Sequence, residues 1–399
     1  MRHTIGLAPG SSVDGVDAAL LEIEGIGLDL SVRPVHSVHR PYARDLRNLI
    51  LKVSSGGDVR QLGLLHRLLG ETLAQAARQV ADQASFDMQQ AQCIGCPGHW
   101  VGQESDSRYP SFLELGMAAV VAERTGVTTV SDFRARDLAA GGQGVPLEAA
   151  ADHILFWHPS EHRALVHLGA VATIVYLPAA GRVQDLIGFE AGPCNRLLDS
   201  LMRRLTGGKE AYDPGGKHAV QGRCIDDALE GWLDHPLWQR RPPKSLSAQM
   251  FGEEFAAQSV RAAQEKHWGL HDLLCTATHL VVHGVASALE KFIPGGRRPD
   301  RVLLSGGGVR NGLLWRLLEN RLTGIPLTRT DEVGIPADAR RAFAHGILAA
   351  LTLDGVPASV PAATGAAGAR LLGSLTPGSS AHWARCLQWM AQLTAPLAG

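Results

Sequence analysis

Three carboxylates are the candidates for acid–base chemistry, and two of them, Asp132 and Glu190, stand where the sequence predicts strand ends. Glu190 follows the short apolar stretch 187–189 and precedes Ala-Gly-Pro at 191–193, so its side chain is expected at the same sheet edge as the other turns. Asp132 and Asp137 are the other candidates. A carboxylate in such a place can take a proton from water or from a hydroxyl. A solvated loop acid has the same local pattern.

Glycine-rich turns suggest a second kind of chemistry, the binding of phosphate by backbone N–H groups. Residues 10–15, Gly-Ser-Ser-Val-Asp-Gly, offer successive N–H groups and two hydroxyls, and Asp14 suits a hydrated Mg²⁺. An ordinary β-hairpin has the same composition. The triplet 306–308 and the following Asn311 join a strand to a helix N-terminus, where a flat or anionic ligand can approach the backbone. Tight packing of strand on helix would also require such glycines.

Two patterns resemble metal sites but lack a complete set of ligands. Cys93 and Cys96 form a C-x-x-C without a second pair at zinc spacing. On one predicted helix, a row of His and Cys side chains recurs every four residues without an acidic ligand among them. They are His271, Cys275, His279 and His283. Packed core residues are the expected interpretation of both patterns, and metal binding is the alternative. The P-loop signature G-x-x-x-x-G-K-[ST] is absent, which excludes that class of nucleotide-binding enzyme.

The composition bears on how phosphate and other partners are bound. The 399 residues carry 38 Lys+Arg against 39 Asp+Glu, so no general electrostatic attraction to nucleic acid or to an acidic membrane is expected. Only six of the 38 basic residues are lysines, which leaves 32 arginines. Glycine is abundant, at 45 residues or about 11% against a usual ~7%. Any phosphate binding is therefore expected to use backbone amides on glycine turns more than lysines.

The elements that must position these residues follow a repeated order. Strand–turn–strand openings are expected near residues 4 and 164, each followed by alternating helices and strands, so we predict two related α/β halves. Longer helices are predicted over 62–84, 112–126 and 272–289. Six cysteines are too few for a disulfide scaffold, and no signal or membrane-spanning segment is predicted. We therefore expect a cytoplasmic protein.

Longer motifs carry a specific resemblance to a known family. The stretch 10–17 is similar to the phosphate-loop motif S-G-T-S-L-D-G-V-D, and 188–195 is similar to G-[FY]-D-T-G-P-G-N. The stretch 131–147 follows the longest signature of the same family nearly residue for residue, and further matches occur at 122–128, 243–245, 305–311 and 334–338. From about residue 4 to 375, the chain thus resembles the anhydro-N-acetylmuramic acid kinase family of the actin/sugar-kinase/Hsp70 superfamily.

The resemblance implies an actin-like (ribonuclease H-like) fold of two α/β lobes around a central nucleotide cleft. It places residues 1–131 plus about 375–399 in an N-terminal lobe and residues 132–374 in a C-terminal lobe. It further implies ATP and Mg²⁺ as cofactors and a homodimer as the assembly. Family members open the 1,6-anhydro ring of a cell-wall muramic sugar with water and phosphorylate O6, with an aspartate as the base on that water. Such a reaction belongs to the recycling of peptidoglycan.

The resemblance also implies three groups of site residues. Glu190 occupies the position of the base. Asp14 holds the metal within a nucleotide-binding group that consists of Gly10, Ser11, Ser12, Asp14, Gly15, Gly169, Gly306, Gly307, Gly308 and Asn311. The sugar-binding group consists of Arg134, Arg136, Gly192, Asn195 and Arg341.

The departures from the family motifs concentrate on the sugar side. Glu190 is one methylene longer than the aspartate of the family, and Arg341 replaces the glutamate of its D-A-M-E-A stretch. Ala170 replaces one glycine of the second phosphate turn, and Glu114 stands in place of the glutamine in L-Q-I-G-D. His99 belongs to a stretch that departs from C-H-G-Q-T. Two alternatives follow, namely a kinase of a different, more acidic sugar and a non-catalytic homologue that binds a nucleotide or a sugar.

Overall fold

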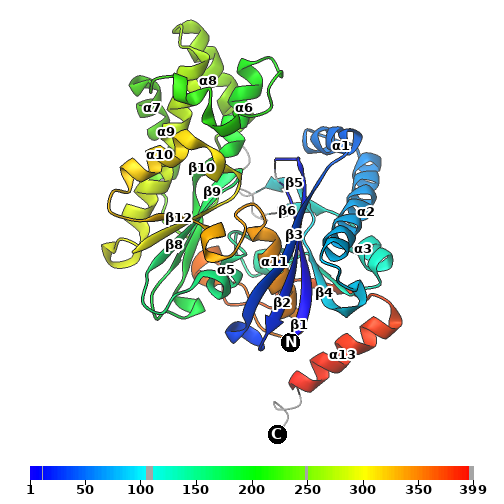
Figure 1. The fold of residues 1–399 in the computed structure, drawn as a ribbon. Helices are drawn as coiled ribbons and strands as arrows, with labels where there is room; N and C mark the ends of the chain where they lie inside the picture. The colour runs from blue at the N-terminus through cyan, green and yellow to red at the C-terminus, as the bar shows by residue number, and fades with distance from the viewer. Residues whose placement is uncertain (11, 105–110, 248–249, 395–399) are drawn as a thin grey trace. The chain divides into compact units, whose positions relative to one another are not determined.

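The computed structural model describes residues 1–10, 12–104, 111–247 and 250–394 (Figure 1). The chain divides into two compact units, the first formed by Met1–Phe156 with Gly334–Gly399 and the second by Trp157–Val333. Residues 132–156 and 334–374, which the family resemblance placed in the second lobe, therefore belong to the first unit here.

The first unit is built on a mixed sheet with the strand order β13-β7-β4-β1-β2-β3. Neighbours pair antiparallel from β3 through β2 to β1 and parallel from β1 through β4 to β7. The strands are β1 (Arg2–Pro9), β2 (Gly15–Glu24), β3 (Ser31–Pro41), β4 (Ala91–Cys96), β7 (Thr129–Ser131) and β13 (Ser374–Thr376).

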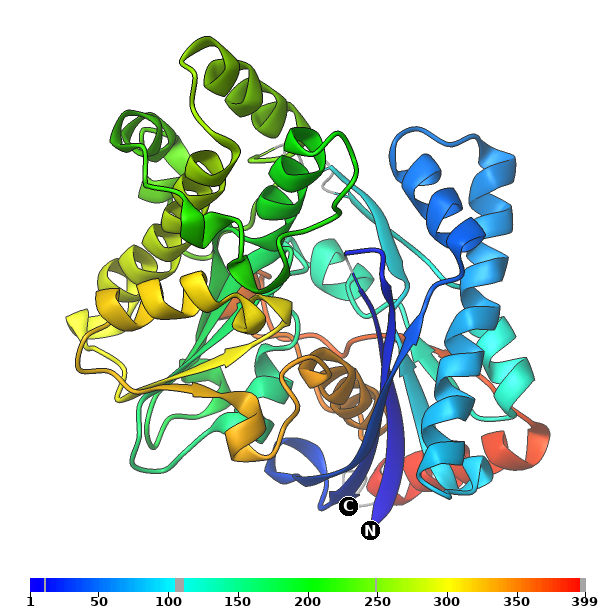
Figure 2. The ribbon, with the colours of Figure 1, turned by 45° about the horizontal axis from the view of Figure 1, so that its top comes forward.

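Helices cover both faces of this sheet, as Figure 2 shows for α2 (Val59–Gln83) and α11 (Arg340–Leu353). Ile5 and Leu7 of β1 join the core cluster that contains the leucines of α2. Gly6 faces α11 so closely that an added Cβ would lie 1.8 Å from a backbone oxygen there. The alternation of side chains along β1 thus decides which helix packs on which face. The remaining helices of this unit are α1 (Arg44–Ser54), α3 (Ala118–Thr125), α4 (Ala135–Ala139), α5 (Ala149–Phe156), α12 (Pro361–Thr364) and α13 (Ser380–Thr394).

A separate hairpin, β5 (His99–Glu104) and β6 (Ser111–Leu115), corrects one expected helix. The prediction of a helix over 112–126 is wrong in its first part, because residues 111–115 alternate between exposed and less exposed positions as a strand. Gly116, with φ of +146°, then turns the chain into α3. Apolar residues at 112, 113 and 115 fit either periodicity, so the pattern alone was ambiguous.

The second unit repeats the topology of the first, with the strand order β10-β9-β8-β11-β12. Pairing is antiparallel from β10 through β9 to β8 and parallel from β8 through β11 to β12. The prediction of two related α/β halves with ribonuclease H-like sheets is confirmed. The strands are β8 (Arg163–Leu168), β9 (Val171–Leu177), β10 (Ile187–Pro193), β11 (Arg301–Ser305) and β12 (Leu327–Arg329).

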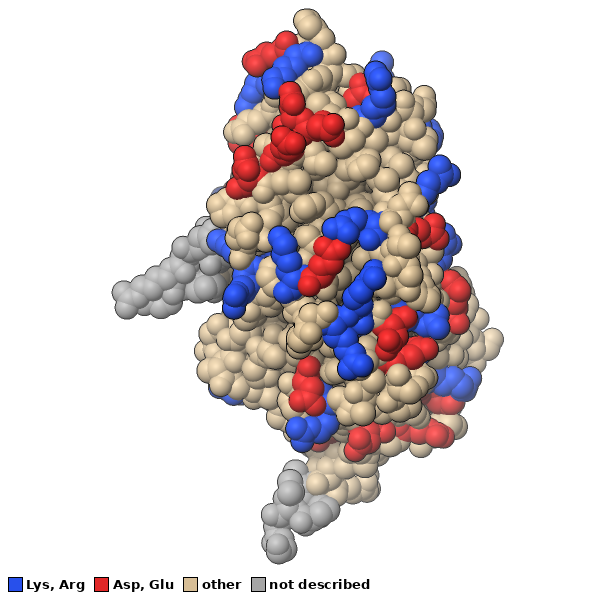
Figure 3. All heavy atoms as spheres, turned by 90° about the vertical axis from the view of Figure 1, so that its left-hand side faces the viewer, with Lys and Arg blue, Asp and Glu red and all other residues tan. Residues whose placement is uncertain are grey.

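The helices of the second unit are α6 (Asn195–Leu205), α7 (Asp226–Leu233), α8 (Glu253–Glu265), α9 (Leu270–Phe292) and α10 (Gly312–Arg321). By length and composition α9 could cross a membrane, but 83% of its most apolar window is buried inside the unit, as in a core helix. On the face drawn in Figure 3, basic and acidic side chains are interspersed, in keeping with the balanced net charge.

Candidate active site

The first glycine turn joins β1 to β2. Gly10 N–H donates to the Gly15 oxygen at 2.8 Å, which closes the turn as in a hairpin. An added Cβ on Gly10 would lie 2.2 Å from Oδ1 of Asp14, so glycine is required beside this carboxylate. Ser12 and Asp14 are exposed, whereas Ser11 lies outside the described residues. The turn therefore presents an exposed carboxylate and a hydroxyl, a donor set that suits a hydrated cation.

Two buried aromatic side chains lie close to Asp14. Tyr42 N–H donates to the Asp14 backbone oxygen at 2.9 Å, and the Tyr42 hydroxyl bonds to Nδ1 of His99 at 3.1 Å. Burial lowers the pKa of His99 to about 4, with the Asp14 charge opposing this shift and the Arg341 charge adding to it. Burial also raises the pKa of the Tyr42 hydroxyl. His99 is therefore neutral at physiological pH. Sequence reasoning missed Tyr42, since nothing in its local pattern marks it.

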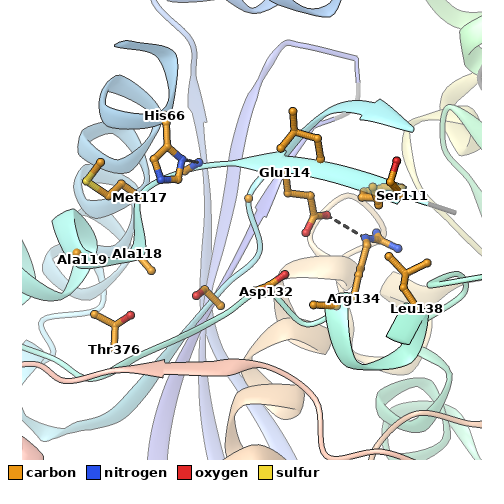
Figure 4. Close-up of a pocket in the computed structure, with 16 residues that line it drawn as sticks. His66, Ser111, Glu114, Met117, Ala118, Ala119, Asp132, Arg134, Leu138 and Thr376 are labelled. Carbon is orange, nitrogen blue, oxygen red and sulfur yellow. Dashed lines mark hydrogen bonds and ion pairs between the residues drawn. The ribbon is translucent and has the colours of Figure 1, made fainter. Parts of the chain in front are cut away.

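A cavity of about 670 Å³ in the first unit contains Arg134, one of the predicted sugar contacts (Figure 4). Arg134 Nε lies 2.9 Å from Oε1 of Glu114, and the guanidinium lies 4.4 Å from the centre of the Phe112 ring. Burial raises the pKa of Glu114, while the charges of Arg134 and Arg341 oppose the shift. Arg136 is exposed and does not line this cavity.

The two other candidate acids have different environments. Asp132 lines the same cavity in a left-handed backbone conformation, with φ of +55°, and burial raises its pKa. Asp137 is fully buried and accepts hydrogen bonds from Gly144 N–H at 2.9 Å and from the Thr364 hydroxyl at 2.7 Å. Asp137 therefore organises the glycine-rich loop 140–144, and its carboxylate is engaged in holding backbone.

Arg341 lies at the start of α11 beside a carboxylate that sequence reasoning missed. Its Nε is 3.3 Å from Oε1 of Glu148. Burial alone would raise the pKa of Glu148, but the charge of Arg341, followed by that of His345, holds it well below the usual range. Arg340 makes a second pair, with its Nε 2.8 Å from Oδ1 of Asp152, and both of these side chains are buried. Two arginines of α11 thus face two carboxylates at and near α5.

In the second unit, Glu190 lies on β10, one of the two edge strands of the sheet. Its backbone N–H donates to the Lys244 oxygen at 3.0 Å, and Leu246 N–H donates to its Oε2 at 2.5 Å. The pairing of β10 with β9 shifts register between Glu190 and Gly192, as at a β-bulge. The positive charge of Arg196 acts on Glu190 as well. A loop 54–56 positions later in the chain therefore holds both parts of Glu190, since the Lys244 oxygen accepts from its backbone N–H and Leu246 N–H donates to its carboxylate.

The structure brings Asn195 together with the glycine triplet and the β8–β9 turn. Asn195 Nδ2 donates to the Leu168 oxygen at 3.0 Å. Added Cβ atoms would lie 2.8 Å from this oxygen at Gly306 and 2.6 Å from the Leu168 Cβ at Gly308, so packing requires glycine at both positions. At Gly307 the nearest atom is 3.8 Å away. The packing interpretation therefore holds for Gly306 and Gly308, whereas Gly307 is exposed and packing does not require a glycine there.

The remaining predicted residues of this unit have structural contacts of their own. Asn195 N–H donates to the Gly169 oxygen at 3.1 Å, which ties helix α6 to the β8–β9 turn. An added Cβ on Gly192 would lie 3.0 Å from the indole ring of Trp238. Asn311 caps α10, since its Oδ1 accepts from Leu314 N–H at 3.0 Å.

The two metal-like patterns lie on packed elements, β4 and α9. Cys93 and Cys96 are free and buried on β4, and burial raises the pKa of Cys96 to about 12. His271 of the four-residue row stacks on His218 with ring centres 5.5 Å apart. Within the described ranges, no three His, Cys, Asp or Glu side chains gather to hold a metal ion.

Comparison with known proteins gives a consistent result over nearly the whole chain. The family model described as anhydro-N-acetylmuramic acid kinase matches residues 2–378. A protein of that name from a Cyanothece species is 38% identical over 379 residues, which cover 94% of this chain and 99% of the relative. Another, from Salinibacter ruber, is 36% identical over 94% of this chain and 96% of the relative. A relative from Bacillus thuringiensis is 34% identical, and the match covers 94% of this chain and 99% of the relative.

Proposed function

The chain belongs to the anhydro-N-acetylmuramic acid kinase family, and from this premise we propose how its residues perform the reaction. The activity is that of an ATP-dependent sugar kinase, which opens 1,6-anhydro-N-acetylmuramic acid with water and phosphorylates O6. The observation that carries the proposal is the placement of Glu190, a carboxylate at a sheet edge that accepts a backbone N–H at 2.5 Å. A carboxylate held in this way remains an acceptor for a proton from water.

In this proposal Glu190 is the general base. It takes a proton from a water molecule whose oxygen bonds to C1 of the sugar. The bond between C1 and O6 then breaks, and O6 bonds to the γ-phosphorus of ATP while ADP leaves. Since the attacking water gains its nucleophilicity only as the proton departs, the position of the Glu190 carboxylate controls the rate.

ATP is the phosphoryl donor, and we propose that both glycine turns contribute to its binding. Ser12 and the turn from Gly10 to Gly15 would do so in the first unit. In the second unit the group consists of Gly169, Gly306, Gly307, Gly308 and Asn311. The open position at Gly307 supports backbone approach there, while the buried cap at Asn311 indicates an indirect role for that side chain.

Magnesium is proposed at Asp14, because this exposed carboxylate fits an ion that keeps most of its water ligands and takes others from phosphates. When bound, Mg²⁺ would neutralise negative charge on the phosphates. Asp14 would be its protein ligand, and the glycine at position 10 leaves room for this carboxylate.

For the sugar we propose contacts from Arg134, Arg341, Asn195 and the backbone at Gly192, with Arg136 as the weakest member because it does not line the cavity. The ion pairs of Arg134 with Glu114 and of Arg341 with Glu148 offset both arginine charges. Because both arginine charges are already paired, they give no reason to expect an additional acidic group on the substrate. The altered sugar side nevertheless motivates a second candidate function, a kinase of a different anhydro sugar. We also propose that the enzyme acts in the cytoplasm as a homodimer, as the resemblance implies.

The direct test is incubation of the protein with MgATP and anhydro-N-acetylmuramic acid, followed by measurement of ADP and sugar phosphate. Formation of the 6-phosphate in step with ADP is expected. An absence of product, while the Salinibacter ruber relative works under the same conditions, would overturn the substrate assignment. A panel of other anhydro sugars and hexosamines then separates a change of substrate from nucleotide binding without turnover, which calorimetry with ATP detects.

A further inference from the structure

The segment Lys244–Leu246 touches Glu190 at two points. The Lys244 oxygen accepts the Glu190 N–H at 3.0 Å, and Leu246 N–H donates to the Glu190 carboxylate at 2.5 Å. Because β10 is an edge strand, the first bond satisfies a backbone group that no neighbouring strand pairs on that side. The second bond holds the side chain itself. The segment therefore holds both the backbone and the carboxylate of Glu190.

The side chain of Lys244 anchors this segment within an aromatic environment. Lys244 is 4% exposed, and its Nζ lies 4.8 Å from the ring centre of Phe292 and 5.8 Å from that of Phe189. Nζ also donates to the Leu237 oxygen at 3.4 Å. An ammonium over aromatic faces is attracted by their quadrupoles. Phe189 precedes Glu190 on β10, so the anchor and the carboxylate lie on opposite faces of one strand.

The surroundings of Lys244 disfavour its charged form, so packing alone does not account for a lysine at this position. Burial, followed by the charges of Lys291 and Arg240, lowers the pKa of Lys244 to about 8. Near neutral pH the protein therefore keeps a buried ammonium beside two other cations. An apolar side chain of the same length would fill this space without a desolvation penalty.

We propose that Lys244 is a positioning residue whose anchored side chain holds the Lys244–Leu246 segment so that Leu246 N–H fixes the Glu190 carboxylate. Glutamate is one methylene longer than the aspartate of the family motif and has one more rotatable bond. The bond to Leu246 removes that freedom and restricts how far the carboxylate extends from β10. The inference rests on the proposed role of Glu190 as the base for its catalytic consequence, although the hydrogen bond itself does not depend on that role.

The test follows the Leu246 amide by NMR in perdeuterated, ¹⁵N-leucine-labelled full-length protein. Leu246→Met assigns the signal by removing it. The short bond to a carboxylate should shift this amide proton downfield, and Glu190→Gln should move it upfield. Lys244→Met should move it upfield as well, whereas Lys244→Arg should retain most of the shift. Lys291→Met is the matched control, because it removes a neighbouring exposed lysine without touching the segment.

Kinetics provides the catalytic readout. Lys244→Met should lower kcat by about tenfold and leave KM for ATP within about twofold, with Lys244→Arg restoring most of kcat. An unchanged Leu246 signal in Lys244→Met overturns the proposal. If the wild type forms no sugar phosphate, the proposed function fails while the NMR result still decides the positioning role. If Lys244→Met does not fold, wild-type titration decides, since the signal should move upfield as the pH passes about 8.

Discussion

Three arginines of the first unit and the proposed base of the second unit are held by different means. In the first unit, arginines face carboxylates through side-chain pairs, namely Arg134 with Glu114, Arg340 with Asp152 and Arg341 with Glu148. In the second unit, the proposed base is held by backbone groups of Lys244 and Leu246. Ion pairs tolerate substitution when both partners change together, whereas a carboxylate bonded to a backbone N–H depends on the segment that carries this N–H staying in place. The predictions below test this difference, from the largest expected effect to the smallest.

Breaking the buried pair at Arg340 should have the largest effect on stability. The Arg340 and Asp152 side chains are 4% and 0% exposed, so Arg340→Met leaves a buried carboxylate without its cation. The free energy of unfolding should fall by about 3–5 kcal/mol in urea denaturation. Arg340→Met combined with Asp152→Ala should recover part of this loss, because no charge is then stranded. If the single and double variants were equally destabilised, the pair would not be the cause.

Glu190→Gln should have the largest effect on catalysis. Glutamine keeps the size of the side chain and its oxygen acceptor but cannot take a proton, so kcat should fall by at least ~10² while affinity for ATP remains nearly unchanged. Steady-state kinetics and calorimetry with ATP measure the two quantities. A parallel loss of ATP affinity would indicate a disturbed nucleotide site instead of a missing base.

Stability should also depend on pH through Lys244. Its pKa is lowered from 10.5 to about 8 in the folded protein, so between these values the unfolded chain binds a proton that the folded protein has lost. Wild-type stability should therefore rise relative to Lys244→Met as the pH increases from 8 to 10.5, by about 2–3 kcal/mol. Urea unfolding of both proteins at pH 7, 8.5 and 10 measures the difference. A constant difference would mean that the ammonium is not desolvated.

Arg341→Glu should have the smallest of these effects. It restores the glutamate of the family stretch but places a second carboxylate beside Glu148, whose Oε1 lies 3.3 Å from Arg341 Nε in the wild type, so two like charges would be adjacent. Because the Arg341 side chain is 25% exposed and can turn toward solvent, a loss of about 1 kcal/mol is expected. Arg341→Met, which removes the pair without adding a like charge, should lose less. If Arg341→Glu were as stable as wild type, repulsion from Glu148 would not act on the side chain at position 341.

Much of the fold could be predicted because its signals are local. Glycine turns between apolar strands indicated the β1–β2 and β8–β9 hairpins, and the repeated order of elements predicted two α/β halves. The hairpin strand β6 was predicted as helix, since its apolar residues fit both periods and its pairing with β5 was not visible in the sequence.

The candidate site was less predictable because its contacts are distant in sequence. The position of Glu190 at a strand end followed from its flanking residues, but Leu246, 56 positions away, gave no sign that it would hold the carboxylate. Similarly, Arg341 was recognised as a departure from the family, whereas Glu148 lies 193 positions from it and became visible only in the folded chain. Local pattern located the chemical groups, and tertiary packing decided their partners.

The most direct test of the account runs the reaction in H₂¹⁸O and locates the label in the product. If Glu190 activates water for attack on C1, wild-type enzyme should form N-acetylmuramic acid 6-phosphate with ¹⁸O in the hydroxyl at C1, and Glu190→Gln should form this labelled product at least ~10² more slowly. Label in inorganic phosphate, with the sugar unlabelled, would show ATP hydrolysis alone and would contradict the assignment of Glu190 as the base for ring opening.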